Sequence, residues 1–279
     1  MKIKVIMTDK AMDRETMDQR EKMLSAAVSK GVSISVDCIK KGPDELDCNT
    51  DEAFAAPELV KESIKAEQEG YDAIVIYCFS DVGIDAVREN VRIPVIGPGE
   101  TSLCAASLLC SRFVVITTES ANIPRTYRRL MRNGIAREKM TSVRALDIPI
   151  GELRADPGAT ARYLKQVCEK AVREEQADGV ILGCLGMAGY GEMLEKELPV
   201  KVIEAAAGGN KNIRVIFGLT AHIFRHNYCT ELCYQIPAIS TKKIAQLLGD
   251  DEKMVLEVYS HIVDEKEKAP DVVAKALAL

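Results

Sequence analysis

Three features that would place a protein in a membrane, direct it to export or attract it to nucleic acid are missing from this sequence. No apolar run approaches the roughly 20 residues that a helix needs to span a bilayer. The stretch at residues 1–7 is too short for a signal peptide, and we predict that it forms a first strand. The net charge is −5, so the chain as a whole is not built to bind polyanions.

The cysteines also lack the pattern of a disulfide scaffold. The chain has nine of them, an odd number, and they are scattered. Such usage predicts reduced thiols and a cytoplasmic location. The length of 279 residues leaves room for about two domains, and a composition of 47% hydrophobic and 28% charged residues is ordinary for a soluble globular protein.

Two segments, residues 72–83 and 178–189, repeat one pattern. Each opens with an acidic residue, continues as a short apolar run and ends in a cysteine, with a glycine five positions later. An uninterrupted apolar run rich in β-branched residues, bounded by turn residues, predicts a buried parallel strand. Cys78 and Cys184 are therefore expected where a strand gives way to a loop, the edge at which open α/β sheets bind ligands.

The elements around these two segments follow the same order in both halves of the chain. The first half is predicted to hold strands at 3–8, 32–39 and 93–97, helices at 13–30, 57–68 and 81–90, and a loop at 40–55. The second half is predicted to hold strands at 112–118, 142–148 and 198–203 and helices at 123–133, 160–176 and 192–197. Such internal duplication of βα units predicts two similar lobes.

The predicted fold is α/β, with two pseudo-duplicated, doubly wound parallel-sheet lobes that face a cleft, and an all-α segment at the C-terminus. We expect the first lobe at 1–98, the second at 99–207, a junction at 208–212 and the helical segment at 213–279. The Gly-rich stretch at 97–100 lacks the spacing and the lysine of a phosphate-binding loop, so we interpret it as a hinge between the lobes.

Paired thiols at equivalent strand ends suggest acid–base chemistry. Backbone N–H groups and the helix dipole beside each cysteine are expected to lower its thiol pKa. One thiolate and one thiol on opposite faces of a bound carbon could remove a proton and return it on the far side, without a metal or an organic cofactor. Cysteine otherwise packs as a small hydrophobe, which is our interpretation of Cys38, Cys48, Cys104, Cys110 and Cys168.

Residues 1 to about 207 resemble the aspartate/glutamate racemase superfamily, and most closely its hydantoin racemase branch. The resemblance is carried by Cys78 with residues 83–86, by residues 93–100 and 114–118, and by residues 183–189 around Cys184. It implies cofactor-independent racemisation by Cys78 and Cys184, with a 5-substituted hydantoin as substrate. It also implies substrate contacts near Ser80, Thr117, Thr118, Gly186 and Met187.

One turn departs from the family pattern. Members usually carry an Asn-rich turn after the first strand, whereas this chain has the sequence Met-Thr-Asp-Lys at residues 7–10. Asp9 would take the last Asn position as a substrate contact, although a carboxylate cannot donate as an amide does. A small dicarboxylate or an amino acid is therefore an alternative substrate, as in aspartate or glutamate racemases and maleate isomerases. The presence of both cysteines favours a racemase over the related decarboxylase.

The C-terminal segment resembles the end of tyrosine recombinases. By that resemblance His222 and Arg225 would bind a phosphate and Tyr259 would be the nucleophile. The family's first Arg and its Lys have no place upstream, and Asp250 replaces a usual His, so we interpret the segment as a helical appendage or a fusion that begins near Gly208. DNA binding or strand joining through this segment is the alternative function of another class.

Further partners follow from the same analysis. We expect a small-molecule substrate, a homo-oligomer, no membrane and no metal. The basic cluster at residues 125–137 is predicted to be a solvated helix face. The group formed by His222, His226, Cys229 and Cys233 is better explained by the recombinase resemblance than by zinc.

Overall fold

The computed structural model describes residues 1–28, 31–132, 139–153, 155–205 and 242. The chain divides into two compact units, Met1–Phe217 and Gly218–Leu279, and the fold below is that of the first. The predicted tail residues His222, Arg225 and Tyr259 lie outside the described residues. Within the described residues, every helix is too short or too polar to cross a bilayer.

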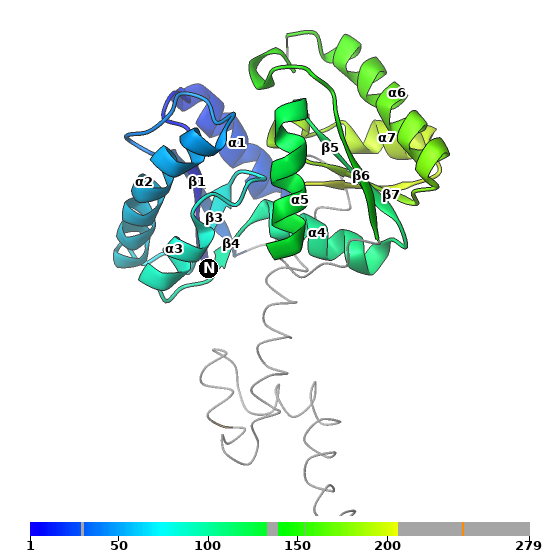
Figure 1. Ribbon diagram of the computed structural model, residues 1–279. Helices are drawn as coiled ribbons and strands as arrows, with labels where there is room; N and C mark the ends of the chain where they lie inside the picture. The colour runs from blue at the N-terminus through cyan, green and yellow to red at the C-terminus, as the bar shows by residue number, and fades with distance from the viewer. Residues whose placement is uncertain (29–30, 133–138, 154, 206–241, 243–279) are drawn as a thin grey trace, which may run out of the picture. The chain divides into compact units, whose positions relative to one another are not determined.

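The first lobe is a parallel sheet of four strands in the order β2-β1-β3-β4 (Figure 1). Its strands are β1 (Lys2–Met7), β2 (Ser33–Cys38), β3 (Ala73–Tyr77) and β4 (Val95–Ile96). The helices that follow them are α1 (Arg14–Ala27), α2 (Asn49–Gln68), α3 (Ile84–Asn90) and α4 (Pro98–Leu109).

The second lobe repeats this topology as β6-β5-β7-β8, again entirely parallel. Its strands are β5 (Phe113–Thr117), β6 (Met140–Ala145), β7 (Gly179–Leu182) and β8 (Lys201–Glu204). Its helices are α5 (Ile123–Arg132), α6 (Pro157–Glu175) and α7 (Gly191–Glu197), with 3₁₀ turns η1 (Ser120–Asn122), η2 (Ile150–Glu152) and η3 (Leu185–Met187). The predicted α/β class with two parallel-sheet lobes is confirmed.

The acidic residue that opens each repeated segment has a structural role that is itself repeated. The carboxylate of Asp72 accepts from the N–H of Lys2 at 2.6 Å, at the start of β1. The carboxylate of Asp178 accepts from the N–H groups of Ser111 and Arg112 at 2.9 Å each, just before β5. In each lobe the acid therefore ties the central strand to its neighbour, and this aligns the strand ends where the cysteines lie.

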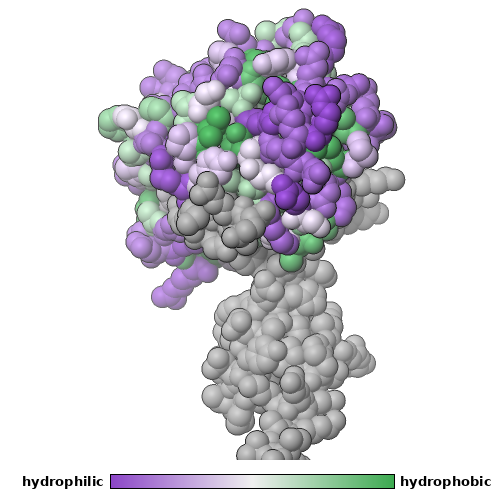
Figure 2. All heavy atoms as spheres, turned by 45° about the vertical axis from the view of Figure 1, so that its right-hand side comes forward, coloured by the Kyte–Doolittle hydropathy of each residue, from purple (hydrophilic) through white to green (hydrophobic). Residues whose placement is uncertain are grey.

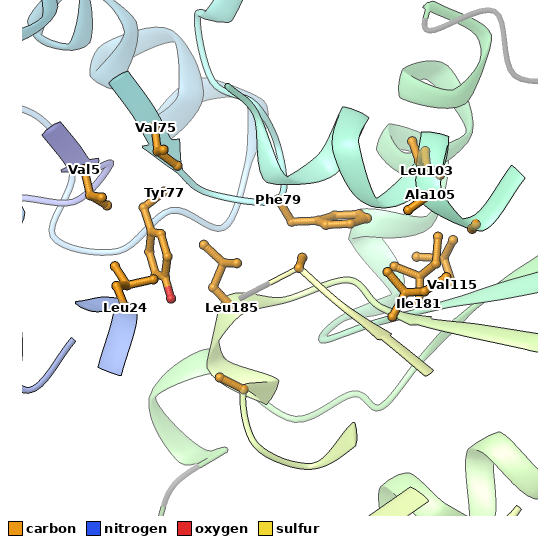
Figure 3. Packing of buried hydrophobic residues seen from close by; sticks show 14 of the residues in the cluster. Val5, Leu24, Val75, Tyr77, Phe79, Leu103, Ala105, Val115, Ile181 and Leu185 are labelled. Carbon is orange, nitrogen blue, oxygen red and sulfur yellow. The ribbon is translucent and has the colours of Figure 1, made fainter. Parts of the chain in front are cut away.

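A shared core joins the lobes. Tyr77 and Phe79 of the first lobe belong to the same buried cluster as Val115, Ile181 and Leu185 of the second. Figure 3 shows Tyr77 beside Leu185, and the Phe79 ring extends to the side where Val115 and Ile181 lie. On the face in Figure 2, hydrophilic side chains predominate and hydrophobic ones form small separate patches. The apolar runs of the sequence are therefore used mainly to fill the interior, where their burial is most stabilising.

Two predicted boundaries are wrong. Helix α2 begins at Asn49 and not at Pro57, because the Asp51 carboxylate accepts from the N–H groups of Asp47 and Cys48 at 3.0 and 2.9 Å and so caps an earlier start. Pro57 lies inside the helix. The stretch at 97–100 is the start of α4 and not a loop hinge.

The start of α4 is held by close approach. Gly99 and Glu100 donate their N–H groups to the Asp81 carboxylate at 2.8 and 2.7 Å, which satisfies groups that a helix start leaves unpaired. A Cβ atom at position 99 would overlap the carbonyl oxygen of Phe79. Only glycine lets α4 pack this close to the loop that carries Cys78.

We therefore expect Gly99→Ala to lower the free energy of unfolding by about 1–3 kcal/mol, because the helix start must move away from Phe79. Gly158→Ala is a matched control, since Gly158 also follows a proline at a helix start. Its Cβ would meet only Asp156 Oδ1 at 3.5 Å and Arg162 Nη1 at 3.6 Å. Urea denaturation measures both variants, and an equal response at the two glycines would contradict the packing argument.

Candidate active site

One cavity of about 620 Å³ is lined by residues of both lobes. It lies at the carboxyl ends of β1, β3, β5 and β7, the edge at which open parallel sheets bind ligands. The structure brings seven of the predicted site residues to its wall: Asp9, Cys78, Ser80, Thr117, Thr118, Cys184 and Gly186. They come from distant parts of the sequence and meet because the two lobes are copies packed across this edge.

Met187 is the predicted site residue that the cavity wall does not include. Its side chain is fully buried in the core of the second lobe. Its N–H donates to the carbonyl of Cys184 at 3.0 Å and helps to close the turn η3. Met187 therefore shapes the loop that carries Cys184, and its side chain does not line the cavity.

Cys78 begins a tight turn immediately after β3. Its N–H donates to the carbonyl of Ile76 at 2.8 Å, and its own carbonyl accepts from the N–H of Asp81 at 3.0 Å. Burial raises the pKa of the thiol. The N–H of Ser80, the Arg129 guanidinium and the Thr8 hydroxyl act in the opposite direction and favour the thiolate.

Cys184 occupies the equivalent place in the second lobe. Its sulfur accepts from the N–H of Gly186 at 3.3 Å. Burial, together with the charge of the Cys78 thiolate, raises the pKa of the Cys184 thiol to about 11, although the N–H groups of Gly186 and Met187 and the charge of Arg20 oppose the rise. Cys78 and Cys184 line the same cavity, and the charge of Cys78 affects the ionisation of Cys184, so the two residues share one environment.

The expectation of lowered thiol pKa values is wrong, because burial raises the pKa of both thiols. A helix start was expected to stabilise each thiolate, but Cys184 precedes the single 3₁₀ turn η3, which is three residues long. Cys78 leads into a turn, and α3 begins only at Ile84. With so few aligned dipoles, the loss of water around each sulfur outweighs the N–H groups that face it.

The predicted solvated face of residues 125–137 is wrong for two of its arginines. Arg125 and Arg129, four residues apart on α5, are only 9% and 8% exposed and line the cavity, whereas Arg128 is exposed. Arg125 pairs with Glu52 at 3.0 Å and donates to the carbonyl of Asp47 at 2.7 Å. The spacing of the two arginines places them on one side of the helix, but only the packing of α5 against the first lobe buries that side.

A buried polar group supports the turn of Cys78. Arg129 donates through Nε to the carbonyl of Ser80 at 3.2 Å, and its guanidinium carbon lies 5.4 Å from the centre of the Phe79 ring. Asp81 is 1% exposed, and its carboxylate holds the start of α4. Burial raises the pKa of Asp81 to about 7, although Arg129 and the two N–H donors oppose the rise.

The sequence analysis also missed Arg20 and Tyr77 on the cavity wall. The Arg20 guanidinium carbon lies 5.6 Å from the centre of the Tyr77 ring. Arg20 lies within the polar run at residues 18–22, so no feature of the sequence singled it out. Among the residues that the structure describes, no group of three or more His, Cys, Asp or Glu side chains is arranged to hold a metal ion.

Asp81 gives a prediction for stability against pH. Its folded pKa of about 7 exceeds the ordinary value of 3.8, so between pH 4 and pH 7 the folded protein binds more protons than the unfolded chain. The free energy of unfolding should therefore fall as pH rises through this window, by about 3–4 kcal/mol from this group. Asp81→Asn should remove that part of the slope.

The measurement is urea denaturation of both proteins in steps from pH 4 to pH 8 under reducing conditions. The difference between the two curves isolates Asp81, because carboxylates with lowered pKa values, such as Asp51 and Glu175, contribute equally to both proteins. Parallel curves across the window would rule out a raised pKa at this position.

A family model described as Asp/Glu/Hydantoin racemase matches residues 14–209 of this chain. The chain is similar to a hydantoin racemase of Pseudomonas sp. (strain NS671), with 35% identity over 180 residues that cover 64% of this chain and 72% of the relative. It is similar to a second hydantoin racemase, from Rhizobium meliloti, with 34% identity over 176 residues that cover 63% and 73%.

Among solved structures, an allantoin racemase from Klebsiella pneumoniae superposes with a TM-score of 0.69 and 27% identity, covering 79% of this chain and 88% of that one. A glutamate racemase from Francisella tularensis superposes with a TM-score of 0.55 at 16% identity, covering 81% of each chain, which indicates a shared fold alone.

Proposed function

Because the chain belongs to the Asp/Glu/hydantoin racemase family and is a racemase, we propose that it inverts one C–H centre with the thiols of Cys78 and Cys184 as an acid–base pair. The observation that carries this proposal is the placement of the two sulfurs on one cavity wall, at the ends of repeated strands in opposite lobes. A racemase needs a base and an acid on opposite faces of one carbon, and a duplicated fold supplies both.

The reaction balances without an oxidant or a cofactor. One cysteine thiolate takes the proton from the carbon next to a carbonyl, and the electron pair of the C–H bond passes to the carbonyl oxygen as an enolate. The other cysteine gives its S–H proton to the opposite face of the same carbon. The product is the mirror image, and the thiol and the thiolate have exchanged roles.

We infer a neutral, ring-shaped substrate such as a 5-substituted hydantoin. The described residues of the cavity wall include four carboxylates (Asp9, Asp13, Asp44 and Glu45) and three guanidiniums (Arg20, Arg125 and Arg129), so the wall carries no excess of positive charge. The hydroxyl groups of Ser80, Thr117 and Thr118 can bond to amide N–H and C=O groups of such a ring. The volume of about 620 Å³ is in the usual range for small-molecule sites.

A small dicarboxylate or an amino acid is the second candidate, and one residue favours it. Arg125 and Arg129 face the acids Glu52 and Asp81, whereas Arg20 forms no ion pair among the described residues. A guanidinium of this kind can bind a carboxylate. Asp9 and Glu45 lie on the same wall and would oppose that binding, so the neutral substrate is preferred.

Single replacement of either thiol should abolish inversion. For Cys78→Ser and Cys184→Ser, we expect racemisation to fall by about 10²–10⁴-fold, because each variant lacks one partner of the proton relay. Each variant should still exchange the C–H of one enantiomer with solvent deuterium while keeping its configuration, and the two variants should prefer opposite enantiomers. NMR in deuterated water, combined with chiral chromatography, measures exchange and inversion separately.

Exchange is the informative measurement because enantiomers have equal free energies. The two directions of any racemase must therefore share one kcat/KM, so a loss of one thiol cannot appear as a directional rate difference. Cys104→Ser is the control, since Cys104 is exposed and lies off the cavity wall. Full inversion by either active-site variant, after subtraction of the spontaneous rate, would refute the two-thiol assignment.

The substrate class is tested with one panel. We expect deuterium incorporation into 5-substituted hydantoins, including allantoin, which is a hydantoin with a ureido group at C5. Aspartate, glutamate and maleate should give no turnover above the enzyme-free rate. Turnover of an acidic amino acid or of maleate alone would transfer the proposal to the second candidate.

A further inference from the structure

The charge of an arginine from the opposite lobe acts on each cysteine. Arg20 is the seventh residue of α1, which follows the first strand of the first lobe, and Arg129 is the seventh residue of α5, which follows the first strand of the second. Both line the cavity. Arg129 acts on Cys78 of the first lobe, and Arg20 acts on Cys184 of the second. The duplication therefore provides two crossed pairs of a guanidinium and a thiol.

The two guanidiniums are held by the residues on either side of Cys78. The ring of Tyr77 lies 5.6 Å from the guanidinium carbon of Arg20, and the ring of Phe79 lies 5.4 Å from that of Arg129. Cation–π contacts of this length fix a flexible arginine without neutralising its charge. The hydrogen bond from Arg129 to the carbonyl of Ser80 adds a second anchor at the Cys78 turn.

The polar atoms near Arg20 are incompletely paired. Arg20 Nε is buried and has no hydrogen-bond partner among the described residues. Burial raises the pKa of the Tyr77 hydroxyl, whereas the charge of Arg20 and a hydrogen bond with its side chain lower it. Tyr77 is 3% exposed and also lines the cavity. Figure 3 shows its ring reaching from β3 toward Leu185, the residue after Cys184. An arginine kept at this place without a hydrogen bond to Nε suggests that its charge, more than its packing, is what the site uses.

We propose that Arg20 and Arg129 are positioning residues, each of which stabilises the thiolate of the cysteine on the opposite lobe. Both cysteines must be thiolates in turn during the proposed racemisation, and both are otherwise opposed by burial. A cation near a buried thiolate offsets part of its lost hydration. The consequence for catalysis rests on the proposed two-thiol function, but the stabilisation of the thiolates does not.

The charges around the two pairs differ. The charge of Arg129 is opposed by Asp81 and Glu52, and Arg125 lies beside it. Asp9 lies near Arg20. Burial raises the pKa of the Asp9 carboxyl group, and the charge of Arg20 opposes this rise. The charge of the Cys78 thiolate also raises the pKa of Cys184. An experiment must therefore examine one thiol at a time.

The test uses two proteins that each keep one cavity thiol. Cys78→Ser reports on Cys184 alone, and Cys184→Ser reports on Cys78 alone. The alkylation rate of the remaining thiol by iodoacetamide is measured at pH 8 by mass spectrometry of the peptide that contains it. Only the thiolate reacts, so the rate follows the thiolate fraction, moderated by the higher nucleophilicity of a more basic thiolate.

We expect a crossed pattern. Arg20→Gln should slow alkylation of Cys184 by about three- to fourfold, the net effect of a pKa rise of about one unit, and leave Cys78 unchanged. Arg129→Gln should slow alkylation of Cys78 and leave Cys184 unchanged. Arg20→Lys and Arg129→Lys keep the charge and should restore much of each rate. Arg128→Gln, on the exposed side of α5, is the control and should change neither rate.

Two results would overturn the proposal: equal slowing of both thiols by either glutamine variant, or no slowing of either. The lysine variants guard against misfolding, because they should recover the rate only if charge is responsible. Alkylation needs no turnover, so the outcomes separate. A crossed pattern in a protein that racemises nothing would refute the proposed function and leave this inference standing, and racemisation without the crossed pattern would do the reverse.

Discussion

Cys78 and Cys184 line one cavity, where burial removes the water that would otherwise stabilise each thiolate. This cost raises the pKa of both thiols, and for Cys184 it raises it to about 11. The rest of the site can be understood as a response to that cost. Backbone N–H groups from short turns and two arginines from opposite lobes face the sulfurs and recover part of it.

The scaffold that presents these groups depends on close backbone approach. The backbone turns at Asp81, three residues after Cys78, with a φ of 52°. The Asp81 carboxylate accepts from two N–H groups at the start of α4. Gly99 allows that helix to approach the carbonyl of Phe79. On the other side, a Cβ at Gly183 would lie 2.9 Å from the carbonyl oxygen of Ile116 and 3.2 Å from the Phe79 ring. The two cysteine loops are therefore held by contacts that permit little displacement.

The charge on the cavity wall links the fold to the choice of substrate. Acidic and basic side chains are both present, and the arginines of α5 are directed to acids of the first lobe. Under the function proposed above, such a wall leaves hydroxyl and N–H groups to recognise a neutral ring, and its positive charge stabilises the thiolates. In this interpretation the arginines stabilise the thiolates of the acid–base pair and do not serve to attract anions from solution.

Much of this protein could be predicted from its sequence, because the signals are local and repeated. The two apolar runs that end in Cys78 and Cys184 predict the strands, their parallel pairing and the edge at which the thiols meet, since period and burial are properties of short segments. The start of α2 was predicted wrongly because Pro57 is a strong signal for the first turn of a helix. The true start lies eight residues earlier, at Asn49, and the sequence does not show that Asp51 caps it.

Only the tertiary structure decided which side chains surround the sulfurs and how they ionise. Arg20 and Arg129 are ordinary charged positions on amphipathic helices until the opposite lobe covers them. Met187 follows the motif of Cys184 but turns into the core. The direction of the thiol pKa shift depends on the balance between desolvation and a few hydrogen-bond donors and charges. Packing between segments that are far apart in the sequence sets this balance. A sequence encodes which groups exist, and the fold determines how much water each one keeps.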